Sequence, residues 1–116
     1  MNKVIFPLSL ILAILSTACS KSSSGGTPFT PDCTTVAKFS VEVAPIISST
    51  CSAKSTCHGS GSIEGPGPLT NYTQIFTSRA SIRDAIIRGI MPKEVSLSNS
   101  QKNAIVCWID AGAPND

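Results

Sequence analysis

The stretch Cys51-Ser52-Ala53-Lys54-Ser55-Thr56-Cys57-His58-Gly59 brings two thiols and the chain's single imidazole into one short segment. Thiols and imidazoles bind metals or bond covalently to cofactors. Five residues separate the two cysteines, and His58 directly follows the second one. This adjacency keeps the imidazole close to one thiol, whatever conformation the spacer adopts. We therefore expect the function of the protein to depend on this stretch.

A cysteine, a spacer and then Cys-His-Gly resembles the attachment pattern of c-type haem, in which two thiols bond to the haem and one imidazole binds its iron. The usual pattern is Cys-x-x-Cys-His, and the spacer from Ser52 to Thr56 is three residues longer. Lengthening a loop of this size costs only about 1 kcal/mol or less in closure entropy, so the extra residues can be absorbed as a bulge.

The composition limits both the size and the partners of the protein. The chain has 116 residues, a net charge of +2 and 14% charged residues, which predicts a single domain. No cluster of Lys and Arg could follow a phosphate backbone, so we expect no nucleic-acid partner. Aromatic residues make up only 5% of the chain, and so thin a core calls for support from a cofactor or disulfides.

The beginning of the chain has the pattern of an export signal. Val4 to Leu15 is a nearly unbroken apolar run, preceded by a lysine and short for a membrane span. The following residues up to Cys19 resemble a bacterial lipoprotein processing site, with Ser16 where an aliphatic residue is usual. We expect a signal peptide at 1–18 and a lipid on Cys19, which would anchor the protein in the cell envelope, on the periplasmic or outer-surface side of a bacterial membrane. The alternative is an ordinary cleaved signal with a free Cys19.

The region after Cys19 predicts a flexible tether and then one domain. Ser20 to Pro28 is rich in Ser and Gly and shows no hydrophobic periodicity. We therefore divide the chain into a signal peptide at 1–18, a lipidated cysteine and tether at 19–35, and a folded domain at 36–116.

Helical periodicity and capping residues predict an all-α domain of three to four short helices with long Gly/Pro loops. Ser40 is expected to cap a helix that carries Val43 and Ile47 and delivers Cys51. Pro45 lies either in the first turn of that helix or at a kink within a longer one.

Further capping signals predict the remaining helices. Thr70 or Asn71 would cap a short helix, and the capping box that begins at Ser81 would start another, which Gly89 would end. A second capping box, Ser98-Asn99-Ser100-Gln101, predicts a helix that continues to about Gly112.

Two loops complete the pattern. Met91 precedes Pro92, and a residue before proline avoids the helical region, so Met91 is expected on a loop. The Pro/Gly-rich segment Gly65-Pro66-Gly67-Pro68-Leu69 follows the cysteine stretch. It resembles the segment that follows the haem motif in small cytochromes c.

The order of these features is similar to that of small class I-type monohaem cytochromes c, and the ending Cys107 to Pro114 is similar to that of cytochrome c-like lipoproteins. The resemblance implies haem c with thioether bonds to Cys51 and Cys57, and His58 and Met91 as axial iron ligands. It also implies that a carbonyl of residues 65–69 accepts the second imidazole N–H, and that the N- and C-terminal helices cross. With both axial positions filled, it implies an electron carrier with redox partner proteins, not an enzyme.

Cysteine arithmetic fits this interpretation. With Cys19 on lipid and two cysteines on haem, Cys33 and Cys107 are left as a candidate disulfide pair. If no haem is bound, the four cysteines of the mature chain beyond Cys19 would form two disulfides, and the sequence does not choose among the connectivities. The protein would then be a disulfide-stapled interaction module, which the long spacer favours.

Metal ions offer a third class of function. Cysteine, histidine and methionine are the ligands of soft copper sites, and zinc could be held by the set Cys33, Cys51, Cys57 and His58.

On the haem interpretation, Arg79, Arg83 and Arg88 would offset the haem propionates or form the solvated face of a helix.

Overall fold

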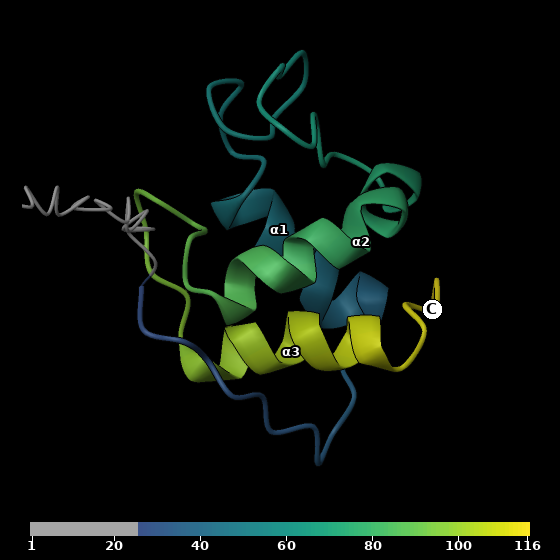
Figure 1. Ribbon diagram of the computed structural model, residues 1–116. Coiled ribbons are helices and arrows are strands. Elements are labelled where there is room, and N and C mark those ends of the chain that lie inside the picture. Colours follow the sequence, from purple (N-terminus) through teal and green to yellow (C-terminus); the bar gives the residue numbers. More distant parts are fainter. Residues whose placement is uncertain (1–25) are drawn as a thin grey trace, which may run out of the picture.

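The computed structural model describes residues 26–116, which form a helical structure without β-strands (Figure 1). Its elements are the π-helical turn η1 at Phe39–Val43, α1 at Ala44–Thr50, α2 at Tyr72–Ile87 and α3 at Asn99–Asp110. The predicted all-α class is confirmed for this part of the chain. The predicted signal peptide at 1–18, the lipidation site Cys19 and the first part of the tether lie outside the described residues. No helix within residues 26–116 has the length and apolar character needed to cross a membrane.

The first helical segment changes from the π-helical turn η1 to the α-helix α1 at Ala44, next to Pro45. This residue has no amide hydrogen and lies in the first turn of α1. Just before it, the amide of Val43 donates to the carbonyl of Lys38 and the amide of Ala44 donates to the carbonyl of Phe39. Both bonds reach five residues back, as in a π-helix. The first of the two alternatives for Pro45 is therefore confirmed, because α1 starts at Ala44 and the proline lies in its first turn. The π-helical turn η1 extends this helical segment toward the N-terminus.

The predicted cap at Ser40 is wrong, because a distant residue closes this helix end. The carboxylate of Asp116 accepts the amide of Phe39 at 2.9 Å, and its backbone carbonyl accepts the amide of Ser40 at 2.9 Å. Lys38 occupies the N-cap position without a side-chain hydrogen bond. The amides of the first two residues of η1 are thus satisfied from the other end of the chain.

The residues from Tyr72 to Ile87 form one continuous helix, so the prediction of a separate helix that starts at Ser81 is wrong. Asn71 caps α2 as predicted, with its side-chain oxygen accepting the amide of Gln74 at 3.0 Å. Residues 72–80, between the cap and Ser81, contain neither Gly nor Pro. The helix therefore continues through a sequence that could also have started one.

Gly89 ends α2, as predicted. Its φ angle is +65°, a conformation that glycine adopts without steric cost. Its amide donates to the carbonyl of Ile86, and the amide of Ile90 donates to the carbonyl of Ala85, both at 3.0 Å. This pair of bonds is the Schellman arrangement, which turns the chain away from the helix axis. Met91 consequently lies on a loop.

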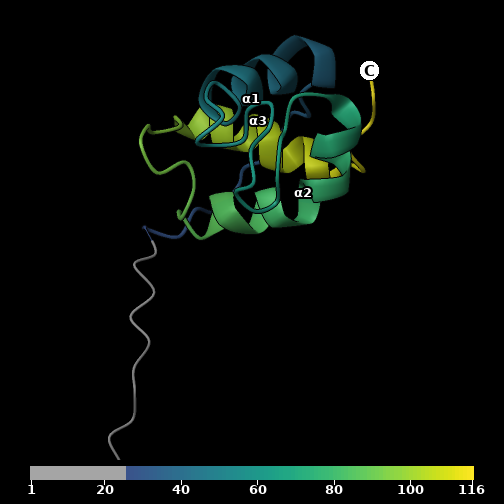
Figure 2. The same cartoon turned by 90° about the horizontal axis from the view of Figure 1, so that it is seen from above.

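Helix α3 packs against both η1 and α2, and seen from above it lies between the N-terminal helical segment and α2 (Figure 2). The predicted capping box of Ser98 and Gln101 opens this helix. Trp108 is fully buried, and its ring centroid lies 5.3 Å from that of Phe39 and 6.5 Å from that of Tyr72. The contact between Phe39 and Trp108 joins the N-terminal helical segment to α3.

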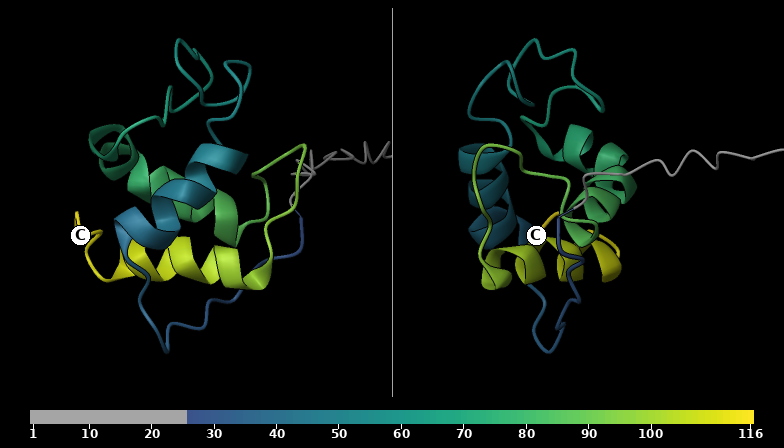
Figure 3. Two further views of the ribbon diagram at one scale, coloured as in Figure 1. Left: turned by 180° about the vertical axis from the view of Figure 1, so that it is seen from behind. Right: turned by 60° about the vertical axis from the view of Figure 1, so that its left-hand side comes forward.

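A disulfide joins Cys33 to Cys107, the pair left over by the cysteine count. It fastens the segment before η1 to the middle of α3. Two long loops, at residues 51–71 and 88–98, leave the helices and carry the cysteine stretch and Met91 (Figure 3). The candidate site is therefore built between loops, on a support of three helices.

Candidate functional site

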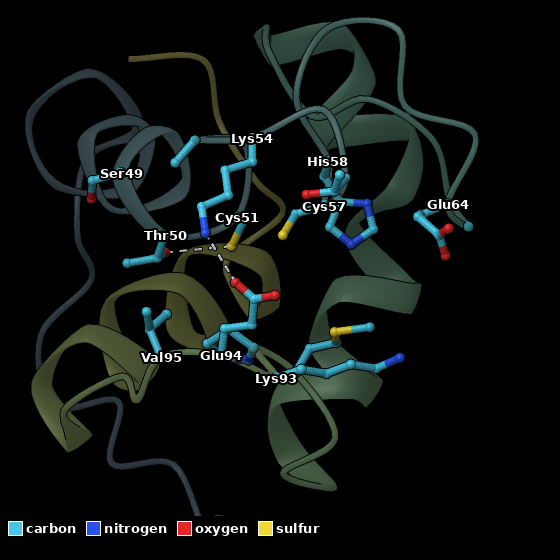
Figure 4. A pocket seen from close by; sticks show the side chains of 15 residues that line it. Ser49, Thr50, Cys51, Lys54, Cys57, His58, Glu64, Lys93, Glu94 and Val95 are labelled. Carbon is cyan, nitrogen blue, oxygen red and sulfur yellow. Dashed lines mark hydrogen bonds and ion pairs between the residues drawn. The ribbon is translucent and has the colours of Figure 1, made fainter.

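Four predicted site residues, Cys51, Cys57, His58 and Met91, line one hollow of about 240 Å³. Figure 4 shows both cysteine sulfurs and the imidazole on one side of it, with Glu94 approaching from the other side. A second hollow of about 650 Å³ extends along α2 and also contacts Cys51, His58 and Met91. The two adjoining hollows are called the crevice from here on. Residues from both loops thus meet in one place.

The walls of the crevice along α2 are mainly apolar. They include four side chains that belong to the buried core: Leu69, Ile82, Ile86 and Leu97. Sites for organic ligands are typically apolar hollows of about 300–1,000 Å³ with a few polar groups that fix orientation. The crevice matches that description.

The five-residue spacer is folded back on itself. The carbonyl of Lys54 accepts the amide of Cys57 at 3.1 Å and the amide of Gly59 at 2.8 Å, and the carbonyl of Cys51 accepts the amide of His58 at 3.0 Å. These bonds shorten the path between the two cysteines. Both thiols therefore reach the same hollow despite the longer spacer.

Gly59 is required for this folded spacer. A Cβ atom on Gly59 would lie 2.7 Å from both the carbonyl carbon and the carbonyl oxygen of Lys54. Contacts this short are not tolerated, so the spacer can pack in this way only against a residue without a side chain. The sequence analysis quoted Gly59 as part of the motif but did not identify this role.

His58 is held in one orientation. Its side chain is buried, and its Nδ1 lies 3.0 Å from the carbonyl oxygen of Gly67, within the predicted Pro/Gly segment. A carbonyl only accepts hydrogen bonds, so Nδ1 donates and Nε2 of the neutral ring keeps its lone pair. Within the described residues, no side-chain nitrogen or oxygen is buried without a partner. Because Nε2 has no protein partner there, it faces the open space of the crevice.

Both crevice cysteines are free thiols and are partly buried. Burial raises the pKa of the Cys51 thiol, and nearby Cys57 raises it further. The hydroxyl of Thr50, 3.5 Å from the Cys51 sulfur, acts in the opposite direction and lowers that pKa. Cys51 is therefore kept mainly as a neutral thiol at physiological pH.

Met91 enters the crevice from the second loop. Its amide and that of Ile90 both donate to the carbonyl of Ala85, at 3.3 and 3.0 Å, which ties the start of the loop to α2. Three residues later, Glu94 forms an ion pair with Lys54 of the spacer at 3.1 Å. Both partners are 65% exposed, so this pair contributes little to stability. It does show that the two loops approach each other.

Arg79 and Arg83 of α2, and Arg88 directly after it, do not line the crevice. Arg83 bonds to Asp110 of α3 at 2.6 Å, and Arg88 pairs with Asp84 at 3.1 Å. Arg79 lies over the ring of Phe76, 4.0 Å from its centroid. Arg79 and Arg83 are half-buried and Arg88 is exposed, and the expectation that these residues offset haem propionates stays a prediction.

The histidine, cysteine and carboxylate side chains of the described residues do not form a metal-binding cluster. Within residues 26–116, no three side chains among His, Cys, Asp and Glu are grouped so that they could hold a metal ion. The zinc set is wrong, because Cys33 is bonded to Cys107. Comparisons with known proteins add no further assignment: no family model, curated protein or solved structure matches the chain.

Proposed function

We propose that the protein is an electron carrier that holds one covalently attached haem c, with His58 and Met91 as iron ligands. The supporting observation is that two free thiols, one oriented imidazole and the methionine line a single apolar crevice. No three His, Cys, Asp or Glu side chains of residues 26–116 cluster as donors for one ion, whereas the thiols, the imidazole and the methionine line a space of the size that an organic cofactor fills. The crevice therefore suits haem better than copper.

Each residue has a distinct task in this proposal. Cys51 and Cys57 supply the thioether bonds, and the folded spacer holds them beside the imidazole. The hydrogen bond to Gly67 fixes the plane of the His58 ring and makes its Nε2 a better donor to iron. The buried side chains of Leu69, Ile82, Ile86 and Leu97 would exclude water from the faces of the haem.

The ligand set decides between electron transfer and catalysis. A haem held by these residues supplies one-electron exchange between ferric and ferrous iron. A methionine ligand raises the reduction potential relative to a second nitrogen ligand and leaves no open position for a substrate. The chain contains no other histidine that could assist chemistry on a bound molecule. We therefore propose a carrier that exchanges electrons with redox partner proteins, not an enzyme.

The proposed location follows from the export signal. A lipid on Cys19 would anchor the carrier to a bacterial membrane, on the periplasmic or outer-surface side. The absence of a Lys/Arg cluster argues against nucleic acid as a partner.

The test is an absorption spectrum of the mature protein made in a host with c-type maturation, before and after denaturation and organic extraction. We expect a Soret band that stays with the polypeptide, and α and β bands that sharpen on reduction with dithionite. A colourless protein that contains copper would indicate the copper site. A colourless protein without metal would leave the disulfide-stapled module.

Single substitutions then test each ligand. His58→Ala should abolish the low-spin spectrum, and Met91→Ala should lower the reduction potential and allow added imidazole or carbon monoxide to bind. Val41→Ala, at a position 63% exposed and away from the crevice, serves as the control and should change neither property. A Met91→Ala protein with an unchanged potential would remove Met91 from the ligand set.

A further inference from the structure

The described part of the predicted tether is fastened to the domain at several points. We call residues 26–33 the N-terminal strap. The amide of Phe29 donates to the carbonyl of Ile87 at 2.8 Å, and the ring of Phe29 packs against the core. The ammonium group of Lys102 lies 5.1 Å from the centroid of that ring. The disulfide of Cys33 then joins the end of the strap to α3.

The start of the strap lies against the residue that ends α2. A Cβ atom on Gly26 would be 2.6 Å from the carbonyl oxygen of Gly89, and one on Gly89 would be 3.0 Å from the carbonyl oxygen of Thr27. The two backbones are therefore in direct contact. Gly89 precedes Met91 by only two residues, and its left-handed conformation sets the direction in which the loop leaves the helix.

The loop beyond this contact has few other supports. Among the described residues, no backbone hydrogen bond involves Pro92 to Leu97. The ion pair between Glu94 and Lys54 is largely exposed. The direction of the loop is thus determined mainly at Gly89, where α2 holds it from one side and the strap from the other.

From this contact we infer that the N-terminal strap positions Met91, with Gly26 as the positioning residue. The inference rests on the proposed role of Met91 as an iron ligand. A side chain on Gly26 would displace the carbonyl of Gly89 and rotate the start of the loop. The methionine would then leave the crevice, although neither the helices nor the residues of the crevice itself had been changed.

The experiment compares Gly26→Val and Gly26→Ala with the control Thr30→Ala, an exposed strap position, in the protein as isolated from a host with c-type maturation. Amide hydrogen exchange is measured at Ile90 and Met91, and at Ile105 and Val106 in the core of α3. We expect Gly26→Val to speed exchange at Ile90 and Met91 about tenfold, with less than about twofold change in α3. Gly26→Ala should give a smaller effect in the same direction, and it preserves the test if the valine variant does not fold.

The spectrum provides a second measurement. In haem-loaded protein, Gly26→Val should weaken the ferric absorption that depends on the sulfur–iron bond, whereas Thr30→Ala should leave it intact. Unchanged exchange at Met91, or equal acceleration throughout α3, would overturn the positioning role. Because exchange is measured whether or not haem is present, a colourless protein with accelerated exchange at Met91 would refute the proposed function and retain the contact between strap and loop.

Discussion

Around α3, the protein is closed by its own side chains, since Trp108 is fully buried against Phe39 and Tyr72 and its indole N–H donates to the carbonyl of Pro114. Around the crevice, the loop at 51–71 is held by several backbone hydrogen bonds and the loop at 88–98 by such bonds only at its two ends, and both loops line two adjoining hollows together with α2. The first region is packed and is also cross-linked by the disulfide between Cys33 and Cys107. The second positions donor groups around a space, so its completion depends on what binds there.

The largest effect on stability is expected from Trp108→Ala. Removing this fully buried side chain should lower the free energy of unfolding by about 3–5 kcal/mol, measured by urea denaturation. Val41→Ala, at a position 63% exposed, is the control and should change it by less than about 0.5 kcal/mol. A small loss for Trp108→Ala would mean that the helical side is not the main source of stability.

A smaller effect is expected on the crevice side, from Gly59→Ala. The added methyl group would lie 2.7 Å from the backbone of Lys54, so the spacer must shift at a cost of about 1–3 kcal/mol. On the proposed function, mass spectrometry should show that part of the protein has lost the thioether bond between haem and Cys51. Gly65→Ala is the matched control, because no atom lies within 4 Å of the added methyl. Equal effects of the two substitutions would contradict the folded spacer.

The ion pair between α2 and α3 should give a modest, pH-dependent effect. The hydrogen bond from Arg83 lowers the pKa of the Asp110 carboxyl. The pair therefore stabilises the fold above the unfolded-state pKa of about 3.9, and this contribution is lost as the pH falls through the lowered folded-state value. Asp110→Asn should cost less than about 1 kcal/mol at pH 7, since both side chains are substantially exposed, and clearly less at pH 2 than at pH 7.

The control for this substitution is Asp84→Asn, which breaks the pair with Arg88 within one helix. It should cost less, about 0.3–0.5 kcal/mol. Urea midpoints at the two pH values provide the measurement. An Asp110→Asn effect of the same size at pH 2 would show that the charge of the carboxylate is not responsible.

The smallest effect is expected at the Cys51 thiol of protein made without haem. Thr50→Ala removes the hydroxyl that lowers the pKa of Cys51, so the thiolate fraction should fall. Alkylation by iodoacetamide at pH 8 should slow about two- to threefold, as followed by peptide mapping. Thr50→Ser keeps the hydroxyl and should react at the original rate. Faster alkylation of the alanine variant would indicate that access to the thiol, and not its ionisation, limits the reaction.

Local sequence signals predicted the helix ends that local hydrogen bonds close. The capping box at Ser98, the cap at Asn71 and the stop at Gly89 all act within a few residues, so their patterns are visible in sequence. The cap of η1 comes from Asp116, and no short pattern around Ser40 indicates that. The capping box at Ser81 failed for a different reason: it is compatible with a helix interior, and the helix before it does not stop.

The candidate site divides in the same way. The adjacency of Cys57 and His58 can be read directly from the sequence, and the proline after Met91 predicts that this methionine lies on a loop. The particular carbonyl that orients the imidazole, that of Gly67, depends on how a Pro/Gly loop folds. The need for glycine at position 59 depends on the path of the spacer, which the motif does not specify.

On the hypothesis that Cys19 is lipidated, the contact between Gly26 and Gly89 also limits how the domain can be oriented relative to the membrane. Six residues separate Cys19 from Gly26, so their Cα atoms can be at most about 25 Å apart when the segment is fully extended. On the hypothesis that Cys19 is lipidated, the methionine side of the crevice would stay close to the bilayer, and lengthening this segment should increase its distance, measured by fluorescence energy transfer to labelled lipid. An unchanged distance would contradict the anchor. On the proposed function, a short tether attached beside the crevice would restrict the redox partners to proteins that approach along the membrane surface.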